Sequence, residues 1–314
     1  MTDTPAPLLH HGVPASTVHL PRGDWTTVLD ALCARFPRVA RGQWLDRMQR
    51  GVVLDETGAA IPPEARYRFA MRVRYFREVI EETPIPFAVT LLHRDAHLVI
   101  ADKPHFLPVM PAGIYVRETL LTRLIEQLDN PHLVPLHRID RATAGLVMLS
   151  TNPRTRAQYQ ALFRERSPGK RIDKRYEALA PPLPCLEFPL VRRSALVRAT
   201  EFFRMQEIAG EPNSKTVIDV MDAGSRSWRY ALTPMTGRTH QLRVHMASLG
   251  AAIDGDSLYP TLQPQASDDH TRPLQLLARA LEFVDPLNGA RRRFDSQRRL
   301  APLPTGVPYP HPAG

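Results

Sequence analysis

The sequence predicts an α+β protein with two folded domains. Its 314 residues amount to about twice the length of an average domain. Segments with helical spacing and segments of apolar strand character mix without the regular alternation of a doubly wound sheet. A proline-bearing connection at residues 81–90, EETPIPFAVT, separates a short basic part from a longer second part.

The composition excludes several classes of protein. With 43% hydrophobic and 23% charged residues, the chain is not expected to be wholly disordered. Its 2 cysteines, Cys33 and Cys185, offer neither a disulfide framework nor the spacing of a zinc site, which suits a reducing cytoplasm. No apolar run approaches the roughly 18 residues of a membrane helix, and we find no secretion signal. We therefore expect a cytoplasmic protein without membrane attachment.

The charge balance concerns partners rather than fold. Lysine and arginine number 41 against 32 acidic residues, which gives a formal net charge of +9. A basic surface attracts polyanions, chiefly nucleic acid, although a merely soluble basic protein is the alternative. Many of the 31 prolines gather near the two ends. We interpret residues 1–14 as a disordered tail and residues 300–314 as a proline-rich tail.

Residues 15–82 predict a small module of helices and strands. Asp24 is placed to cap a first helix whose apolar residues fall on one face. A second helix at residues 41–50 is followed by Gly51, which suits a left-handed helix end. Apolar residues then alternate with arginines at residues 69–75, as in a strand.

Arginines gather on this module. Five of them, against the single acid Asp46, lie between residues 35 and 50. We interpret this excess of one sign as phosphate contact rather than as a solvated helix face. The expected RNA contacts in this module are Arg38, Arg41, Arg47 and Arg50.

Residues 36–61 and the basic strand that follows resemble the S-four-like RNA-binding domain, an αL-type module at the front of many RNA-modifying enzymes. Ala40 stands where that family usually has a serine before the second helix, which weakens the cap but not the topology. The resemblance implies that this module grips RNA.

The most informative segment for chemistry is HRIDRATAGL at residues 137–146. Asp140 lies between Arg138 and Arg141 on a polar loop that joins two apolar strands. Positive neighbours favour a charged carboxylate, which can act as a nucleophile or base, and the two arginines can equally hold phosphates. The alternative is a structural ion-pair cluster that ends a strand. No dinucleotide, P-loop or metal-ligand pattern accompanies the segment.

This segment resembles the HRLDRxTSGLLL signature of the RluA-type pseudouridine synthases, and other blocks agree in order. Residues 100–104, IADKP, resemble the strand that ends in Asn-Lys-Pro, with Asp102 in place of the asparagine. Residues 174–178, KRYEA, resemble the Lys/x-Tyr-x-Ala strand. Residues 237–246, GRTHQLRVHM, reproduce the third motif residue for residue, and GDSLY follows at residues 255–259.

The resemblance covers residues 90–290 and implies an RNA pseudouridine synthase. Behind the S-four-like domain at residues 15–82, it places a catalytic domain with a mixed, mainly antiparallel sheet at residues 86–299. The implied reaction is an isomerisation that moves the uracil of a uridine from a carbon–nitrogen to a carbon–carbon bond, with no cofactor and no metal. The base must leave the folded RNA to enter a pocket. We expect a monomer that acts on structured RNA, first ribosomal RNA and second transfer RNA.

The resemblance also implies roles for individual residues. Asp140 is the essential catalyst, either by attack on the anomeric carbon or by assisting a glycal intermediate. Arg243 pairs with this aspartate through its guanidinium fork. Tyr176 stacks on the flipped base and reaches the ribose, unless it is an ordinary strand tyrosine. Arg138, Arg141, Arg238 and His240 are expected to contact RNA or brace the loop. Lys103 is expected either to approach the pocket as an RNA contact or to fix the turn.

Three positions depart from the family pattern. Ala144 replaces a serine, Leu277 replaces a histidine, and Ala-Ala at residues 251–252 replaces His-Pro. We expect little consequence from Ala144, and from Leu277 an effect on substrate placement rather than on the reaction. Two other functions stay open: an RNA-binding protein with an inert catalytic fold, and a nucleoside-hydrolysing enzyme that uses Asp254 or Asp256 as its second carboxylate and releases free uracil.

Overall fold

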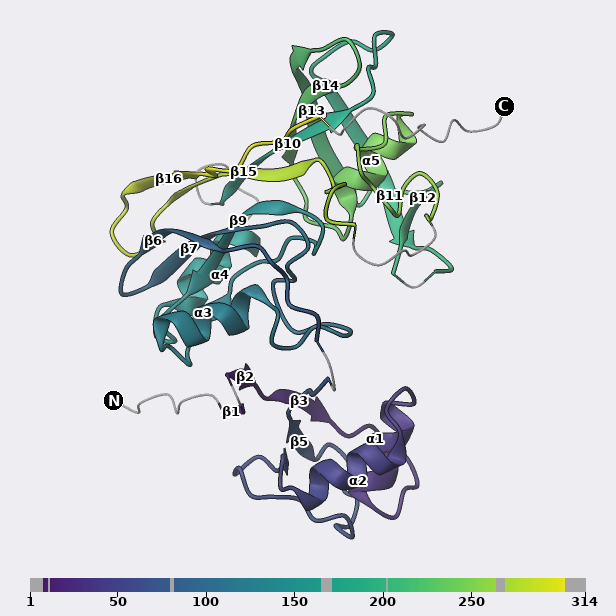
Figure 1. Ribbon diagram of the computed structural model, residues 1–314, viewed down its shortest axis with the longest axis vertical. Coiled ribbons are helices and arrows are strands. Elements are labelled where there is room, and N and C mark those ends of the chain that lie inside the picture. Colours follow the sequence, from purple (N-terminus) through teal and green to yellow (C-terminus); the bar gives the residue numbers. More distant parts are fainter. Residues whose placement is uncertain are drawn as a thin grey trace. The chain divides into compact units, whose positions relative to one another are not determined.

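The structure is a computed structural model that describes residues 8–10, 12–79, 82–164, 171–201, 203–263 and 269–302. The chain divides into two compact units (Figure 1), one of Met1–Pro84 with Met110–Leu133 and one of Ile85–Val109 with Val134–Gly314. Within the predicted tail at residues 1–14, β1 (Leu9–His10) pairs antiparallel with β2 (Val13–Pro14). Residues 1–7 and 11 of that tail, and residues 303–314 of the other, lie outside the described residues.

In the first unit, two helices pack on a small sheet. Its elements are β3 (Ser16–His19), α1 (Val28–Arg35), α2 (Arg41–Gln49), β4 (Val53–Leu54) and β5 (Arg72–Tyr75), with strand order β3-β5-β4. The fully buried side chains of Leu32, Trp44 and Val73 belong to one core between helices and sheet. The same unit contains α3 (Leu120–Leu128), which follows the predicted helical spacing.

The start of α1 differs from the prediction. Its N-cap is Thr27 rather than Asp24: the Thr27 hydroxyl accepts a hydrogen bond from the backbone N–H of Asp30, and the Asp30 carboxylate accepts one from the backbone N–H of Thr27. This reciprocal capping box satisfies two N–H groups at once, which a cap at Asp24 would not achieve. At the end of α2, Gly51 adopts the predicted left-handed conformation with φ 71°.

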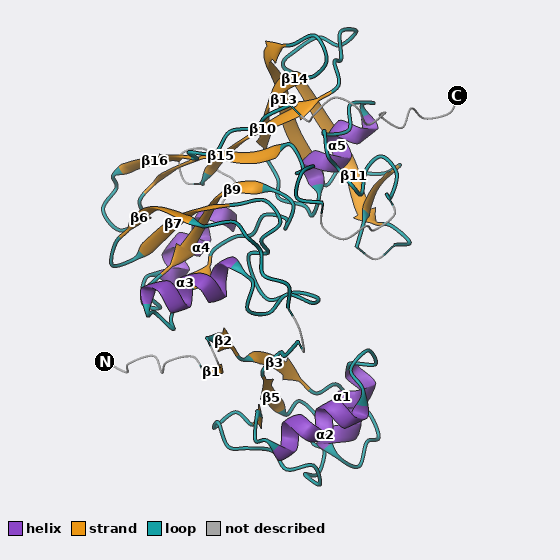
Figure 2. Cartoon of the chain, in the orientation of Figure 1, coloured by secondary structure: helices purple, strands orange, loops and turns teal. Residues whose placement is uncertain are grey.

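The second unit is built on one mixed sheet, and Figure 2 shows its strands in orange. The eleven described strands follow the path β12-β11-β13-β14-β10-β15-β9-β7-β6, with β16 paired to β15 and β8 to β9. Their bounds are β6 (Thr90–Arg94), β7 (Leu98–Lys103), β8 (Val134–Pro135), β9 (Ala144–Ser150), β10 (Asp173–Ala180), β11 (Leu190–Arg198), β12 (Met205–Ile208), β13 (Ser214–Ala223), β14 (Trp228–Pro234), β15 (Leu276–Val284) and β16 (Arg291–Asp295). Among these strands only β9 and β15 pair in parallel, so the predicted mixed, mainly antiparallel sheet is confirmed.

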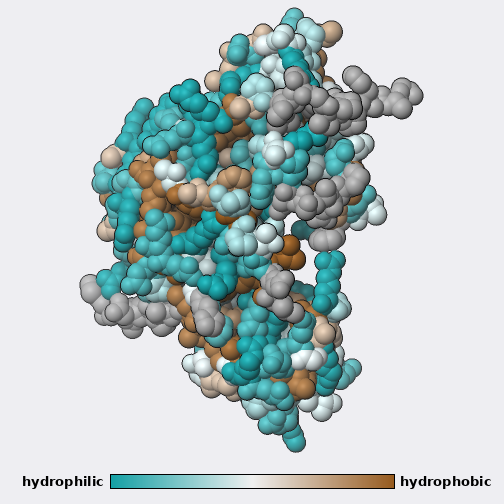
Figure 3. Space-filling view, in the orientation of Figure 1, coloured by the Kyte–Doolittle hydropathy of each residue, from teal (hydrophilic) through white to brown (hydrophobic). Residues whose placement is uncertain are grey.

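Two helices cover parts of this sheet. The first, α4 (Arg156–Arg164), buries Tyr159 and Leu162 in a core with side chains of β7, β9 and β15. The second, α5 (Gln241–Ser248), buries Leu242 and Met246 in a core with β10, β13 and β14. No helix in the described part of the chain is long and apolar enough to span a bilayer. Hydrophilic residues cover most of the face shown in Figure 3.

The parallel junction of β9 and β15 depends on Gly145. This residue pairs with Ala278 and has φ 109°, a conformation that favours glycine. A Cβ atom at Gly145 would lie 2.3 Å from the carbonyl oxygen of Ala278. Glycine therefore allows the two backbones to approach directly after the HRIDRATAGL loop, and this approach positions the loop.

Candidate active site

Asp140 lies on the loop between β8 and β9, in the second unit. The backbone carbonyl of Asp140 accepts a hydrogen bond of 3.1 Å from the N–H of Thr143, which closes the turn. From the protein interior, the Lys103 ammonium donates to the carbonyl oxygens of Pro104 at 2.9 Å and Arg141 at 3.2 Å. The Asp140 side chain is 26% exposed. The loop is thus fixed from inside while its carboxylate remains accessible.

Arg243 of α5 joins two carboxylates. Its side chain is 3% exposed, and its Nη1 lies 3.4 Å from Oδ2 of Asp140. Its Nε and Nη2 donate to the two oxygens of Asp256 at 2.7 and 2.6 Å. The guanidinium fork therefore holds Asp256, not Asp140 as the resemblance implied, and a single nitrogen faces the predicted catalyst.

Asp256 is the partner that the sequence analysis did not assign to Arg243. Its side chain is fully buried, and Oδ1 also accepts hydrogen bonds from the backbone N–H groups of Leu258 and Tyr259. Burial by itself would lower the pKa of Arg243, but Asp256, and after it Asp140, raise the pKa above its ordinary value. Arg243 therefore stays charged beside the exposed carboxylate. In the sequence, the GDSLY block that contains Asp256 was the available signal for its role as the partner of Arg243.

His240 faces the same carboxylate. It is the N-cap residue of α5 with φ 52°, its side chain is 12% exposed, and its Nε2 lies 3.7 Å from Oδ2 of Asp140. Its Nδ1 lies 2.9 Å from the Tyr259 hydroxyl, which accepts a hydrogen bond from the backbone N–H of Met205. Since that hydroxyl oxygen already accepts one hydrogen bond, it is suited to donate its proton to Nδ1, leaving Nε2–H toward Asp140. Burial lowers the pKa of His240 and favours this neutral form.

Tyr176 reaches the site from β10. Across the sheet it pairs with Ala278 of β15, which in turn pairs with Gly145 of β9, so one row of residues connects Tyr176 to the strand that follows the Asp140 loop. The side chain is half-buried. Burial, and next the charge of Asp140, raise the pKa of Tyr176, which keeps the phenol protonated. A protonated phenol beside a carboxylate has a face for stacking and a hydrogen to donate.

The turn at Asp102 and Lys103 is structural. Asp102 is buried, accepts hydrogen bonds from Ser296 Oγ and the N–H of Gln297, and lies 3.4 Å from the Arg298 guanidinium. This ion pair accommodates the aspartate that replaces the family's asparagine. Lys103 is also fully buried, so it fixes the turn and has no surface to offer RNA, which corrects its assignment as an RNA contact.

The predicted RNA contacts of the second unit have different surroundings. Arg138 and Arg238 are exposed, and Arg238 donates to the carbonyl of Asn213 at 3.2 Å. Arg141 is half-buried, with its guanidinium 6.0 Å from the ring centre of Phe106. Two exposed cations and one that is partly covered therefore remain as possible phosphate contacts beside Asp140.

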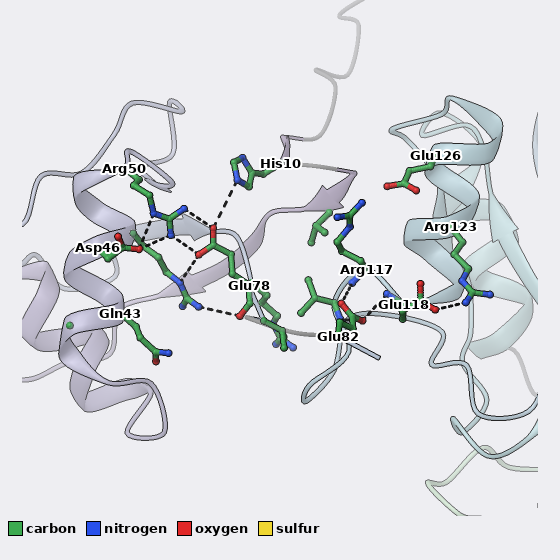
Figure 4. A pocket seen from close by; sticks show the side chains of 16 residues that line it. His10, Gln43, Asp46, Arg50, Glu78, Glu82, Arg117, Glu118, Arg123 and Glu126 are labelled. Carbon is green, nitrogen blue, oxygen red and sulfur yellow. Dashed lines mark hydrogen bonds and ion pairs between the residues drawn. The ribbon is translucent and has the colours of Figure 1, made fainter. Parts of the chain in front are cut away.

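The arginines of the first unit have acidic partners, contrary to the expectation of uncompensated charge. Arg41 pairs with Asp30 at 2.6 Å. The side chain of Arg47 is 10% exposed and pairs with Glu78 at 3.3 Å, so Arg47 is not available to RNA. Arg50 pairs with Glu78 at 2.7 Å and with Asp46 at 2.8 Å (Figure 4). Arg38 is exposed.

The ion pairs of Arg47 and Arg50 line a cavity of about 800 Å³ within the first unit. Figure 4 also shows Glu82, whose carboxylate accepts hydrogen bonds from the backbone N–H groups of Val116, Arg117 and Glu118. Because Asp46, Glu78, Glu82 and Glu118 are occupied by internal partners, and the cavity holds none of the residues around Asp140, it is a structural feature rather than the candidate active site.

The hydrolase alternative needs a second available carboxylate, and neither candidate fits. Asp256 is enclosed and bound to Arg243. Asp254 is 5% exposed and accepts a hydrogen bond of 2.7 Å from Ser227 Oγ. Asp140 is therefore the accessible carboxylate of this trio. Among the described residues, no group of three or more His, Cys, Asp or Glu side chains is arranged to hold a metal ion.

Comparison with known proteins supports the resemblance to RNA pseudouridine synthases. The family model for RNA pseudouridylate synthase matches residues 97–248, a range that contains Asp140, Tyr176 and Arg243. The dual-specificity RNA pseudouridine synthase RluA of Salmonella typhi is 31% identical over 216 residues, which cover 66% of this chain and 91% of that protein. An uncharacterised RNA pseudouridine synthase of Synechocystis is 28% identical over 235 residues, which cover 74% of this chain and 79% of that protein.

Solved structures show the same fold. Human RNA Pseudouridylate Synthase Domain Containing 4 superimposes with a TM-score of 0.51 and 26% identity over 68% of this chain and 88% of that chain. Human RNA Pseudouridylate Synthase Domain Containing 1 gives a TM-score of 0.54 with 23% identity, over 69% and 86%. Motifs, fold and relatives agree, and this chain belongs to the RluA-type family of RNA pseudouridine synthases, which isomerise uridine in RNA.

Proposed function

We propose that Asp140 is the catalytic group of this RNA pseudouridine synthase and that it acts on a uridine flipped out of structured RNA. The observation that carries the proposal is the meeting of an accessible carboxylate with a buried, charged Arg243 and a protonated Tyr176. Such a constellation keeps the carboxylate ionised when bound RNA excludes water, because a fixed cation offsets the cost of its desolvation.

In the proposed reaction, the bond between the ribose C1′ and N1 of uracil breaks with help from Asp140. The carboxylate either adds to C1′ or assists formation of a glycal. The detached uracil turns and C5 bonds to C1′, as the bond from C1′ to Asp140 breaks or as C2′ of the glycal regains its proton. C5 then loses its proton and N1 takes one up, so that N1–H replaces C5–H. Bonds and protons balance within the substrate, so the proposal needs neither a redox partner nor a metal.

The surrounding side chains take separate roles in this proposal. Arg243 keeps one nitrogen for Asp140 because Asp256 occupies the other two. His240 presents its Nε2–H toward Oδ2 at 3.7 Å, a separation that shortens to a hydrogen bond when substrate closes the site. Tyr176 provides a ring for the flipped base and a hydroxyl for the ribose. His240 is thus a positioning residue rather than an RNA contact.

The first unit is proposed to add affinity for RNA without reading its sequence. Arg38, Arg41 and Arg50 retain surface exposure even where they form ion pairs, so they can exchange an internal carboxylate for a phosphate. We propose ribosomal RNA as the first target and transfer RNA as the second, with the enzyme acting as a cytoplasmic monomer. A comparison of pseudouridine maps of total RNA from cells with and without this gene tests the target.

The catalytic assignment is tested with Asp140→Asn. RNA labelled with tritium at C5 of uridine releases the label when C5 bonds to C1′, so tritium release measures turnover. We expect Asp140→Asn to abolish release while RNA affinity stays within about twofold, since one uncharged amide replaces one carboxylate of equal size. Asp222→Asn, at an exposed position of β13, is the matched control and should retain activity. Turnover by Asp140→Asn would overturn the assignment.

A further inference from the structure

A basic cavity adjoins the active-site motifs and has no role in the mechanism above. It has a volume of about 410 Å³ and lies within the second unit. The charged residues that line it are Arg164, Arg171, Asp173, Lys174 and Arg238. Asp173 pairs with Arg171 at 3.0 Å. In the described part of the chain, the other three cations have no carboxylate in ion-pair contact.

Lys174 is the central group of this cavity. It is half-buried, and no described residue accepts a hydrogen bond from its ammonium. Its Nζ lies 3.7 Å from the place where a Cβ of Gly237 would stand, so the glycine leaves open space beside the ammonium. Burial, and next the charge of Arg171, lower the pKa of Lys174. A partly desolvated ammonium without an acceptor is unfavourable, and an anion in the cavity would relieve this cost.

Two residues that line the cavity lie close in sequence to groups of the candidate active site. Lys174 precedes Tyr176 by two positions on β10, which corresponds to about 7 Å along a regular strand, and the pairing with β15 shifts register between Arg175 and Tyr176. Arg238 precedes His240 by two positions at the start of α5. One nucleotide of an unstacked strand spans a similar length. An anion in the cavity would therefore lie next to the flipped uridine along the RNA chain.

We propose that Lys174 and Arg238 bind one backbone phosphodiester of the substrate RNA, adjacent to the flipped uridine. This inference rests on the proposed function. Asp173 is paired with Arg171, so a phosphodiester supplies the negative charge and acceptor oxygens for Lys174 and Arg238, and Gly237 gives it room. The contact carries no base information, so it sets the register of the RNA strand relative to Asp140.

The first test is Lys174→Gln, with Lys215→Gln as the matched control because Lys215 does not line the cavity. We expect Lys174→Gln to raise KM about tenfold, with kcat nearly unchanged, because it removes one charge-assisted hydrogen bond. The dependence of log KM on log salt should lose about one unit of slope. Lys174→Arg should keep the slope. An unchanged salt slope in a folded, active Lys174→Gln variant would refute the site.

The second test changes the RNA instead of the protein. A synthetic stem–loop substrate receives a neutral methylphosphonate at one linkage at a time around the target uridine. A methylphosphonate at one linkage adjacent to the target uridine should raise the KM of the wild-type enzyme as much as Lys174→Gln does. The same substitution should raise the KM of Lys174→Gln little further, because both changes remove the same contact. If every linkage behaves alike, the proposal is wrong. The proposed function is tested separately by tritium release. If the wild-type enzyme releases tritium and Asp140→Asn does not, the proposed function stands even when the phosphate site is refuted.

Discussion

Replacing Asp256 with asparagine removes the charge that holds the buried Arg243 while keeping the size of the side chain. Arg243 is 3% exposed, and its two hydrogen bonds to Asp256 measure 2.6 and 2.7 Å. Loss of one partner of such a buried pair costs about 3–5 kcal/mol. Because Arg243 keeps its contact with Asp140, we take about 3 kcal/mol, which for a unit of this size lowers Tm by roughly 6–12 °C.

Asp140→Asn should lower the stability of the protein much less than Asp256→Asn does. The Asp140 side chain is 26% exposed and lies 3.4 Å from one nitrogen of Arg243, so its loss should cost less than about 1 kcal/mol. Scanning calorimetry together with tritium release distinguishes the roles of the two carboxylates. Asp256→Asn should unfold at a lower temperature than the wild type, whereas Asp140→Asn should unfold near the wild-type temperature but be inactive. Equal Tm values, or a larger drop for Asp140→Asn, would refute the division between a supporting and a reacting carboxylate.

Two further predictions concern stability. Burial lowers the pKa of His245 from 6.5 to about 4, so the unfolded chain binds more protons between these values; stability is fully present above pH 6.5 and falls by about 3 kcal/mol as the pH decreases toward 4. Urea unfolding from pH 7 to 4.5 should show this loss on top of the loss from His105 and His137, whose pKa values burial also lowers, and His245→Gln should make the decline with pH shallower. A His245→Gln profile parallel to that of the wild type would contradict the contribution of His245. Gly145→Ala forces a Cβ against the Ala278 backbone and should cost roughly 3 kcal/mol or more, whereas Gly289→Ala, also at positive φ but with nothing within 4 Å, should cost about 1 kcal/mol by the same measurement.

The fold could be predicted from the sequence where local patterns decide it. The helical spacing of the apolar residues around Leu120 and the apolar runs at β7 and β9 were sufficient for element type, and motif resemblance indicated the mainly antiparallel sheet. The start of α1 was wrong because two polar residues, Asp24 and Thr27, compete as caps, and only Thr27 has Asp30 three residues later to complete the box. Local competition of this kind is decided by reciprocal hydrogen bonds that spacing alone does not reveal.

The candidate site shows a second limit of the sequence. Motif resemblance indicated Asp140, Arg243 and Tyr176; the structure places the Arg243 guanidinium 3.4 Å from Asp140, and Tyr176 lies on β10 in register with Ala278, which pairs with Gly145 of β9. The resemblance placed the guanidinium fork of Arg243 on Asp140, whereas the fork holds Asp256 and a single nitrogen faces Asp140, because both carboxylates are plausible partners on charge alone. The choice depends on burial. Asp256 is enclosed, and a buried carboxylate is stable only when its oxygens accept several hydrogen bonds. The Arg243 fork and the backbone N–H groups of Leu258 and Tyr259 donate these bonds. Likewise, the arginine excess near α2 is balanced by Glu78, which is distant in sequence.

The departures from the family pattern illustrate why distance in sequence matters. Ala144 and Leu277 each replace a polar residue of the family pattern, and taken singly only Leu277 suggests a change in substrate placement. In the structure these two residues are direct neighbours across the parallel junction of β9 and β15, and both belong to one buried apolar cluster with Leu179 and Leu300. A lone serine or histidine there would need a buried hydrogen-bond partner, whereas an apolar pair needs none. The two replacements are therefore one coupled change in the core behind the site, and the Asp140 loop, which Gly145 fixes next to this pair, keeps its position.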